Sequence, residues 1–214
     1  MTISDWIATR RYPVLRMPRT RRRRCPSSKR RGHRVPLLEC LENRLLLATV
    51  ELTPSKDTTL IEIPLGNSNG AGPFLISGRV SSNQSNSIRR AAMAFNLSAI
   101  PAGSTVTGAS LSVHVSRDRG GAQTYALHKL KGDWGEGAST GNGRGTPATN
   151  GSATWTHRFF PNTPWTNPGG DYEPLLSATE TVRGRYRTTW SSNRMVDECR
   201  VGWTIRRLIL VGSC

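Results

Sequence analysis

The clearest pattern in the chain is an alternation of apolar and polar side chains over residues 109–116. Ala109, Leu111, Val113 and Val115 share one parity, and Ser or His residues occupy the other. A period of two predicts a strand that is buried on one face of a sheet and wet on the other. Similar short stretches rich in apolar residues, separated by turns that contain Pro and Gly, predict further strands at 50–63, 89–97, 122–130 and 185–192.

Short strands with recurring turn signals, and without a helical period of 3.6, predict an all-β protein. We expect a jelly-roll-like antiparallel β-sandwich over residues 49–198. A basic leader that is expected to be disordered precedes it at 1–48, and an aberrant tail follows at 199–214. Within the sandwich, the polar, glycine-rich stretch 135–154 predicts a long mobile loop.

The formal charge of +16 would normally indicate an anionic partner, but its distribution is uneven. Residues 1–50 hold 13 Lys and Arg against 3 Asp and Glu, whereas residues 51–198 carry a net charge of about +3. Nucleic-acid binding through the Arg-rich leader is therefore an alternative function, although few aromatic residues there offer base stacking. The four cysteines lie in the leader and the tail, so the central region has neither a disulfide framework nor a zinc-ligand spacing.

The central sequence carries a family resemblance. "RRAAMAFNLSAIPAGSTVTGASLSVHVS", "LHKLKGDWGEG" and "ATWTHRFF" resemble the DNRLRE domain family of bacterial and archaeal extracellular proteins, over roughly residues 49–198. The resemblance implies a jelly-roll β-sandwich carried by large secreted or surface-attached proteins. It also implies carbohydrate binding, because related domains bind acidic polysaccharides.

The end of the leader carries a second resemblance. "LECLENRLLLA" is similar to the LEPR-XLL type leader of planctomycete surface proteins, from which Cys40 departs. This similarity implies export to the cell surface or the medium. The alternative is a basic arm that binds acids nonspecifically. No apolar run approaches the roughly 20 residues that a membrane-spanning helix needs.

The central region shows no sign of a catalytic centre. It has no GxSxG elbow, HExxH pair, phosphate-binding loop or Cys/His ligand cluster, and we expect a noncatalytic protein. Asp133 and Glu136 share one loop, but the Trp-x-Glu-Gly context favours a structural corner. We assign Trp134, Glu136 and Trp155 to that corner.

The candidate ligand-binding residues are an exposed aromatic ring and several cations. Sugars present apolar faces ringed by hydroxyls, and Trp165, in a loop of Pro and Asn, is the best candidate for an exposed platform. The guanidinium group of arginine can donate two parallel hydrogen bonds to a carboxylate, so cationic side chains would recognise an acidic polysaccharide. The candidates are Arg89, Arg90, His157 and Arg158, which alternatively belong to solvated strand faces.

The predicted function is thus a noncatalytic, extracellular module that binds acidic polysaccharide. The alternative is a purely structural or adhesive module without a sugar ligand. No cofactor is expected, except that Asp57 could contribute to a structural calcium site.

The tail "CRVGWTIRRLILVGSC" departs from the closing strand that the family resemblance predicts. We interpret Cys199–Cys214 as a frameshifted reading of that strand. The segment Leu208–Val211 is expected to close the sheet poorly, leaving an exposed edge and a free Cys214. The nucleotide sequence of the gene tests this hypothesis, because an intact downstream frame would continue the domain.

Overall fold

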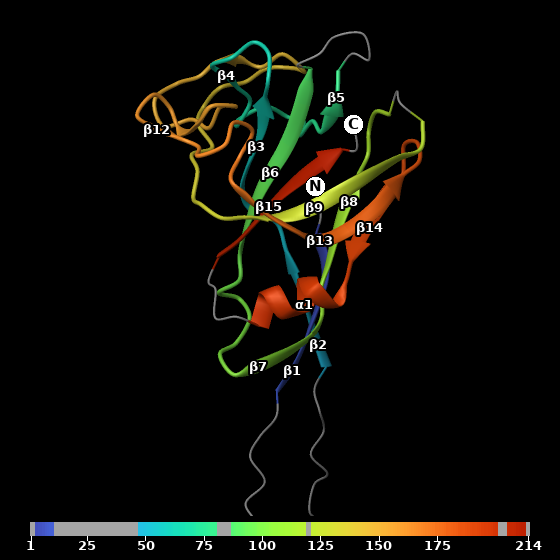
Figure 1. Cartoon of the computed structure of the whole chain (residues 1–214). Coiled ribbons are helices and arrows are strands. Elements are labelled where there is room, and N and C mark those ends of the chain that lie inside the picture. The colour runs from blue at the N-terminus through green and yellow to red at the C-terminus, as the bar shows by residue number, and fades with distance from the viewer. Residues whose placement is uncertain (1–2, 11–46, 81–86, 119–120, 201–204, 213–214) are drawn as a thin grey trace, which may run out of the picture.

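The fold is all-β and antiparallel, as predicted, with one short helix (Figure 1). A computed structural model describes residues 3–10, 47–80, 87–118, 121–200 and 205–212. The largest sheet has six strands, arranged as β13-β9-β15-β6-β3 with the short β5 beside β6. Their bounds are β3 Pro54–Ile61, β5 Gly78–Arg79, β6 Ile88–Asn96, β9 Gln123–Leu130, β13 Tyr172–Val182 and β15 Ile205–Gly212.

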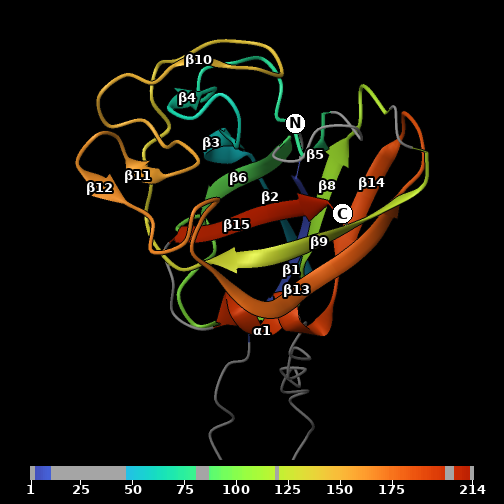
Figure 2. The same ribbon diagram turned by 45° about the horizontal axis from the view of Figure 1, so that its top comes forward.

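Smaller sheets lie against both faces of this large sheet (Figure 2). One side has the order β2-β1-β7 and the pair β14-β8. Their bounds are β1 Ile3–Arg10, β2 Leu47–Leu52, β7 Ser104–Gly108, β8 Ser110–His114 and β14 Arg187–Ser191. The other side has two-residue or three-residue strands, paired as β10-β4 and β11-β12. Their bounds are β4 Asn67–Ser68, β10 Thr146–Pro147, β11 His157–Phe159 and β12 Thr163–Pro164.

Strand β6 shows how the alternation of side chains builds two cores. Ala91, Met93 and Phe95 join the first cluster, which we call the main core, whereas Ala92 and Ala94 join a second, the loop core. Successive side chains of a strand point to opposite faces, so one strand supplies both. The main core includes Leu111 of β8, Trp190 of β14 and Met195 of the helix, and the loop core includes Trp134, Trp155 and Trp165 from the segment between β9 and β13.

The closing strand of the large sheet comes from the segment that we interpreted as an aberrant tail. β15 lies between β6 and β9, and Leu208, Ile209 and Leu210 are all buried. The expectation of poor closure is therefore wrong. Four consecutive apolar residues suit a strand with both faces covered, whatever the origin of the segment. Cys214 lies outside the described residues.

Sequence patterning missed the helix α1, Asn193–Arg200. Ser192 caps it, because its hydroxyl accepts the backbone N–H of Met195 at 3.0 Å and donates to the carbonyl of Ser177. Only eight residues long, the helix depends on tertiary contacts, including those of the buried Met195 and Val196. It also crosses the expected domain boundary after residue 198.

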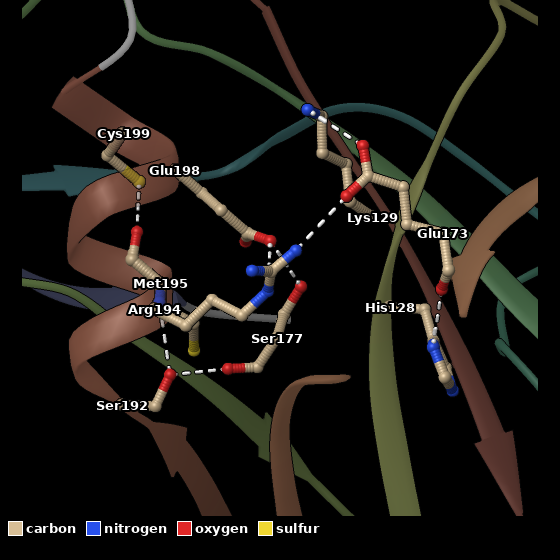
Figure 3. Close-up of polar contacts among 9 residues, drawn as sticks. All are labelled: His128, Lys129, Glu173, Ser177, Ser192, Arg194, Met195, Glu198 and Cys199. Atoms are coloured by element: carbon tan, nitrogen blue, oxygen red, sulfur yellow. Dashed lines mark hydrogen bonds and ion pairs between the residues drawn. The ribbon is translucent and has the colours of Figure 1, made fainter. Parts of the chain in front are cut away.

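Charged side chains of α1 are paired with residues of β13 (Figure 3). Arg194 lies 3.1 Å from Glu173 and 3.2 Å from Glu198 in ion pairs, and Glu198 also accepts a hydrogen bond from Ser177 at 3.0 Å. Glu198 is 9 % exposed. Glu198 is the buried charge of this network, and its ion pair with Arg194 offsets part of the cost of burying it.

Two further expectations need revision. The leader predicted over 1–48 contains the strand β1, which pairs with β2 and β7, and its residues 11–46 lie outside the described part. The stretch 135–154, expected to be a long mobile loop, contains β10 and the buried residues Ser139, Ser152 and Ala153. Its polar residues are held by hydrogen bonds, for example between Ser139 and the carbonyl of Pro147 at 3.1 Å.

Candidate functional site

A small hollow lies on the side of the large sheet that the loops cover. It has a volume of about 220 Å³ and is lined by Arg90 of β6, Tyr172 of β13, and Asn167, Pro168 and Gly170 of the loop that precedes β13. A guanidinium, an amide and a phenol thus converge on one concave surface. This combination of a ring and a few polar groups is typical of a small binding site.

Arg90 is held between two aromatic rings. Its guanidinium carbon lies 4.9 Å from the ring centroid of Trp155 and 5.3 Å from that of Tyr172. Nη1 donates to the carbonyl of Gly169 at 2.8 Å, whereas none of the described residues accepts a hydrogen bond from the buried Nε. Cation–π contacts and one hydrogen bond therefore fix the cation at the hollow without neutralising it.

The loop at the hollow is shaped by Asp171 and Gly169. The Asp171 carboxylate accepts the backbone N–H groups of Thr166 and Asn167, each at 2.8 Å. Burial opposes ionisation of Asp171, but these hydrogen bonds outweigh it and lower its pKa. Gly169 has φ +89°, and a Cβ there would collide with Arg90 and lie 2.8 Å from the Trp155 ring, so glycine is required.

Tyr172 is positioned by a neighbouring imidazole. The ring centroids of His128 and Tyr172 lie 4.8 Å apart, with the planes tilted by 48°. His128 itself is buried, and its Nδ1 lies 2.9 Å from the carbonyl of Glu173, which assigns the Nδ1–H tautomer. A buried, hydrogen-bonded histidine acts here as a support for the Tyr172 ring.

Arg89, which we predicted as a partner of carboxylates, is not available to a ligand. It is 3 % exposed, and its guanidinium donates to the carbonyls of Gly143 and Ile63 at 2.8 and 2.7 Å. Burial is the main cause that lowers its pKa. The physical reason is that the carbonyls of Ile63, Ile88 and Gly143 all lie within reach of Arg89, and its guanidinium donates to each of them.

The expectation that Trp165 is an exposed platform is also wrong. Trp165 is 5 % exposed and belongs to the loop core. Its Nε1–H donates to the carbonyl of Thr154 at 3.0 Å. A loop rich in Pro and Asn folds back on the sheet here, because its only large apolar side chain gains more from burial than from contact with water.

His157 and Arg158 are partly buried on β11 and do not line the hollow. His157 Nδ1 lies 2.9 Å from the hydroxyl of Thr156, and its ring packs edge to face on Phe160. Arg158 lies over the Phe159 ring, 6.0 Å from its centroid. Of the four cations that the sequence singled out, only Arg90 reaches this hollow.

The residues assigned to a structural corner are Trp134, Glu136 and Trp155, of which Glu136 contacts Asp57. Trp134 is fully buried and Trp155 is 7 % exposed, both in the loop core. Glu136 accepts the backbone N–H of Asp57 at 2.9 Å. Burial and then repulsion from Glu136 raise the pKa of Asp57 to about 6.

The neighbourhood of Asp57 and Glu136 bears on the predicted calcium site. Calcium takes six to eight oxygen ligands, and the two carboxylates of Asp57 and Glu136 would supply only some of them. Within the described ranges, no group of three or more His, Cys, Asp or Glu side chains is arranged to hold a metal ion. The role of Asp57 in a calcium site stays a prediction.

Sequence reasoning missed Tyr172, Asn167 and Gly170. They lie in the stretch "PNTPWTNPGGDY", which the sequence shows only as a loop. Its available signal was the tyrosine that follows Pro-Gly-Gly-Asp, but nothing local indicates that this ring meets Arg90. In the described part of the chain, no helix is long and apolar enough to cross a membrane.

Comparison with known proteins identifies the family. No curated protein and no solved structure matches the chain. The sequence model of one family, described as carbohydrate-binding module family 96, matches residues 48–167, which is more than half of the chain. The matched range covers β2 to β12 and ends at the hollow. The chain therefore belongs to carbohydrate-binding module family 96.

Proposed function

We propose that this chain is a noncatalytic carbohydrate-binding module that binds acidic polysaccharide, with the hollow between Arg90 and Tyr172 as its binding site. The observation that carries the proposal is the guanidinium of Arg90, which two aromatic rings fix beside a concave surface. Family membership supports carbohydrate as the ligand class.

The chemistry of the hollow supports an acidic sugar in particular. Nη1 of Arg90 donates to the carbonyl of Gly169 and Nε is buried, so Nη2 is the guanidinium nitrogen that a carboxylate would contact. The Tyr172 ring offers an apolar surface, and the amide of Asn167 offers hydrogen bonds to hydroxyls. A neutral sugar would use the ring and the amide but would leave the cation without a counter-charge.

Binding to a polyuronate tests the proposal directly. Affinity electrophoresis in gels that contain alginate or polygalacturonate, with dextran as a neutral polymer, measures retardation of the full chain. We expect Arg90→Gln to weaken polyuronate binding at least tenfold, since a hydrogen bond to a charged group contributes about 1.5–3 kcal/mol. Tyr172→Ala is a second variant of the same hollow, and it retains the cation.

Arg158→Gln is the matched control, because Arg158 is also a partly buried arginine on an aromatic ring but lies outside the hollow. It is expected to bind as the wild type does. Thermal unfolding of each variant separates loss of binding from loss of folding. Equal retardation of the wild type and Arg90→Gln would contradict the proposal, and absence of binding to any polysaccharide would favour a structural or adhesive module.

We further propose that the module acts outside the cell as part of a surface protein. The similarity of "LECLENRLLLA" to the leader of exported proteins supports this location. Protease treatment of intact cells, followed by immunodetection of the chain, tests it. Degradation on intact cells is expected, and protection until lysis would contradict it.

A further inference from the structure

The turn between β13 and β14 carries a second concentration of cations around an aromatic ring. Arg183, Arg185 and Arg187 are exposed, and Tyr186 between them is 70 % exposed. We call these four residues the hairpin tip. His114 lies opposite Arg187 in the pairing of β8 with β14 and is exposed as well.

The backbone of the hairpin tip is anchored although its side chains are exposed. The N–H of Gly184 donates to Asp118 at 2.8 Å, and the carbonyl of Tyr186 accepts the N–H of Val115 at 3.0 Å. Gly184 has φ +78°, and a Cβ there would lie 3.2 Å from the Tyr186 ring. The ring is therefore presented from a fixed turn, which lowers the entropy lost when a ligand stacks on it.

A hollow adjoins the tip between the end of β13 and the start of β14. It has a volume of about 260 Å³ and is lined by Arg183, Tyr186 and Arg187, with Thr181, Thr188 and Thr189. Glu180 also lines it, and its carboxylate accepts the backbone N–H of Thr181 at 3.0 Å. Hydroxyls, guanidinium groups and one ring are the groups that an acidic sugar requires.

The arginines of the tip differ from Arg194 and Arg207, which form ion pairs. Arg194 pairs with Glu173 and Glu198 (Figure 3), and Arg207 pairs with Asp133 at 3.0 Å. The side chains of Arg183, Arg185 and Arg187 form no ion pair or hydrogen bond with the residues that the structure describes. Three like charges within five positions repel one another, and a polyanion would relieve that repulsion.

The hairpin tip is remote from the Arg90 hollow. Tyr172 begins β13 and Tyr186 follows its end, and an 11-residue strand spans roughly 35 Å. In Figure 2 the turn that connects β13 to β14 lies on one side of the molecule, and the loops with β10, β11 and β12 lie on the other. The tip also lies outside residues 48–167, the range that the family shares.

We infer that the hairpin tip is a second, separate binding site for acidic polysaccharide. The choice of glycan as the anion rests on the function proposed above, whereas the site itself rests on the geometry of the tip. Two sites at opposite ends of one module let it bind two polysaccharide chains, or one chain at two points. When one chain occupies both sites, the second binding event is intramolecular, and this raises the overall affinity.

Calorimetric titration of the full chain with a short oligouronate, at fixed ionic strength, tests this inference. Tyr186→Ala and the triple variant R183Q/R185Q/R187Q are each expected to bind one equivalent fewer than the wild type. Arg90→Gln is expected to lose a different equivalent, so that the combined variant loses two. All proteins keep the leader, whose nonspecific contribution is therefore common, and Arg144→Gln is a control for an exposed arginine elsewhere.

The outcomes separate the two proposals. Loss of one equivalent on the tip variants alone, with Arg90→Gln unchanged, would support the tip and contradict the Arg90 site. An unchanged number of equivalents in both tip variants would overturn the inference. A short DNA duplex is the competing polyanion: if it binds the tip as tightly as the oligouronate and Tyr186→Ala has no effect on either, the tip is a general polyanion surface and the inference fails.

Discussion

The two faces of the large sheet are covered in different ways. The main core is closed by regular elements, with Leu111 of β8, Trp190 of β14 and Met195 of α1 packed against aliphatic side chains. The loop core is closed by the segment between β9 and β13, which has little regular structure and contributes Trp134, Trp155 and Trp165. The Arg90 hollow lies on the loop-covered face.

This difference accounts for the position of the Arg90 hollow on the loop-covered face. Strands and a helix that pack regularly fill the space between them, at densities close to those of crystals. The segment between β9 and β13 instead brings polar backbone groups, such as the carbonyl of Gly169, to the margin of the loop core. Cation–π contacts with Trp155 then hold Arg90 at that margin.

The largest expected effect is the loss of a core tryptophan. Trp134→Ala and Trp190→Ala remove fully or almost fully buried indoles from the loop core and the main core respectively. Each is expected to lower the free energy of unfolding by about 3–5 kcal/mol, measured by denaturant titration. Under conditions where both variants remain folded, only Trp134→Ala is expected to weaken polyuronate binding at the Arg90 hollow, and equal weakening there by both variants would contradict the contrast between the faces.

A smaller loss of stability is expected at Arg89. Arg89→Met removes the guanidinium that donates to the carbonyls of Gly143 and Ile63. We expect destabilisation by about 1–3 kcal/mol in the same titration, with polyuronate binding retained. Arg90→Met, one residue along, is expected to show the reverse: a small change of stability and a large loss of binding. A binding defect in Arg89→Met at full folding would contradict the assignment.

The N-terminal cap of α1 tests the face of the sheet that regular strands and the helix cover. Ser192→Ala removes the hydroxyl that accepts the N–H of Met195 and bonds to Ser177. A loss of about 1 kcal/mol is expected, as for other helix N-caps. Thr149→Ala is a control that removes a hydroxyl from the loop-covered side, where Thr149 bonds to Ser152 at 2.9 Å. Unchanged polyuronate binding in Ser192→Ala is expected, and a binding loss would link the two faces.

The smallest effect concerns the pH dependence of stability through Asp57. Its pKa of about 6 in the folded chain lies above its ordinary value of 3.8, so the folded state prefers the protonated carboxyl. The stabilising contribution is present below pH 4 and is lost as the pH rises through 6. Asp57→Asn is therefore expected to raise the melting temperature relative to wild type at pH 7 more than at pH 4.

Calcium distinguishes two interpretations of the same carboxylates. Melting curves in EDTA and in calcium, at pH 7, would show a calcium-dependent rise in the wild type that Asp57→Asn lacks if the predicted site exists. An identical melting temperature in both buffers would leave Asp57 and Glu136 as a repulsive pair without a metal.

Much of the fold was visible in the sequence, and much of the site was not. The alternation at 109–116 correctly predicts β8, and the strand pattern at 89–97 predicts β6. The helix α1 was missed, because eight residues give too short a pattern and its stability comes from packing. Arg89 and Arg90 are both predicted to bind ligand, because a strand places them on opposite faces but its sequence does not show which face a ligand can reach.

The sequence by itself determined the all-β class, the alternation of side chains along β8 and the positions of the main turns, because these depend on local periodicity and turn chemistry. Only the tertiary structure decided that Trp165 is buried, that β15 lies in the middle of the sheet, and that Arg90 meets Gly169. The last two residues are 79 positions apart. Such contacts depend on how loops and strands pack together, and no local pattern in either segment encodes the partner.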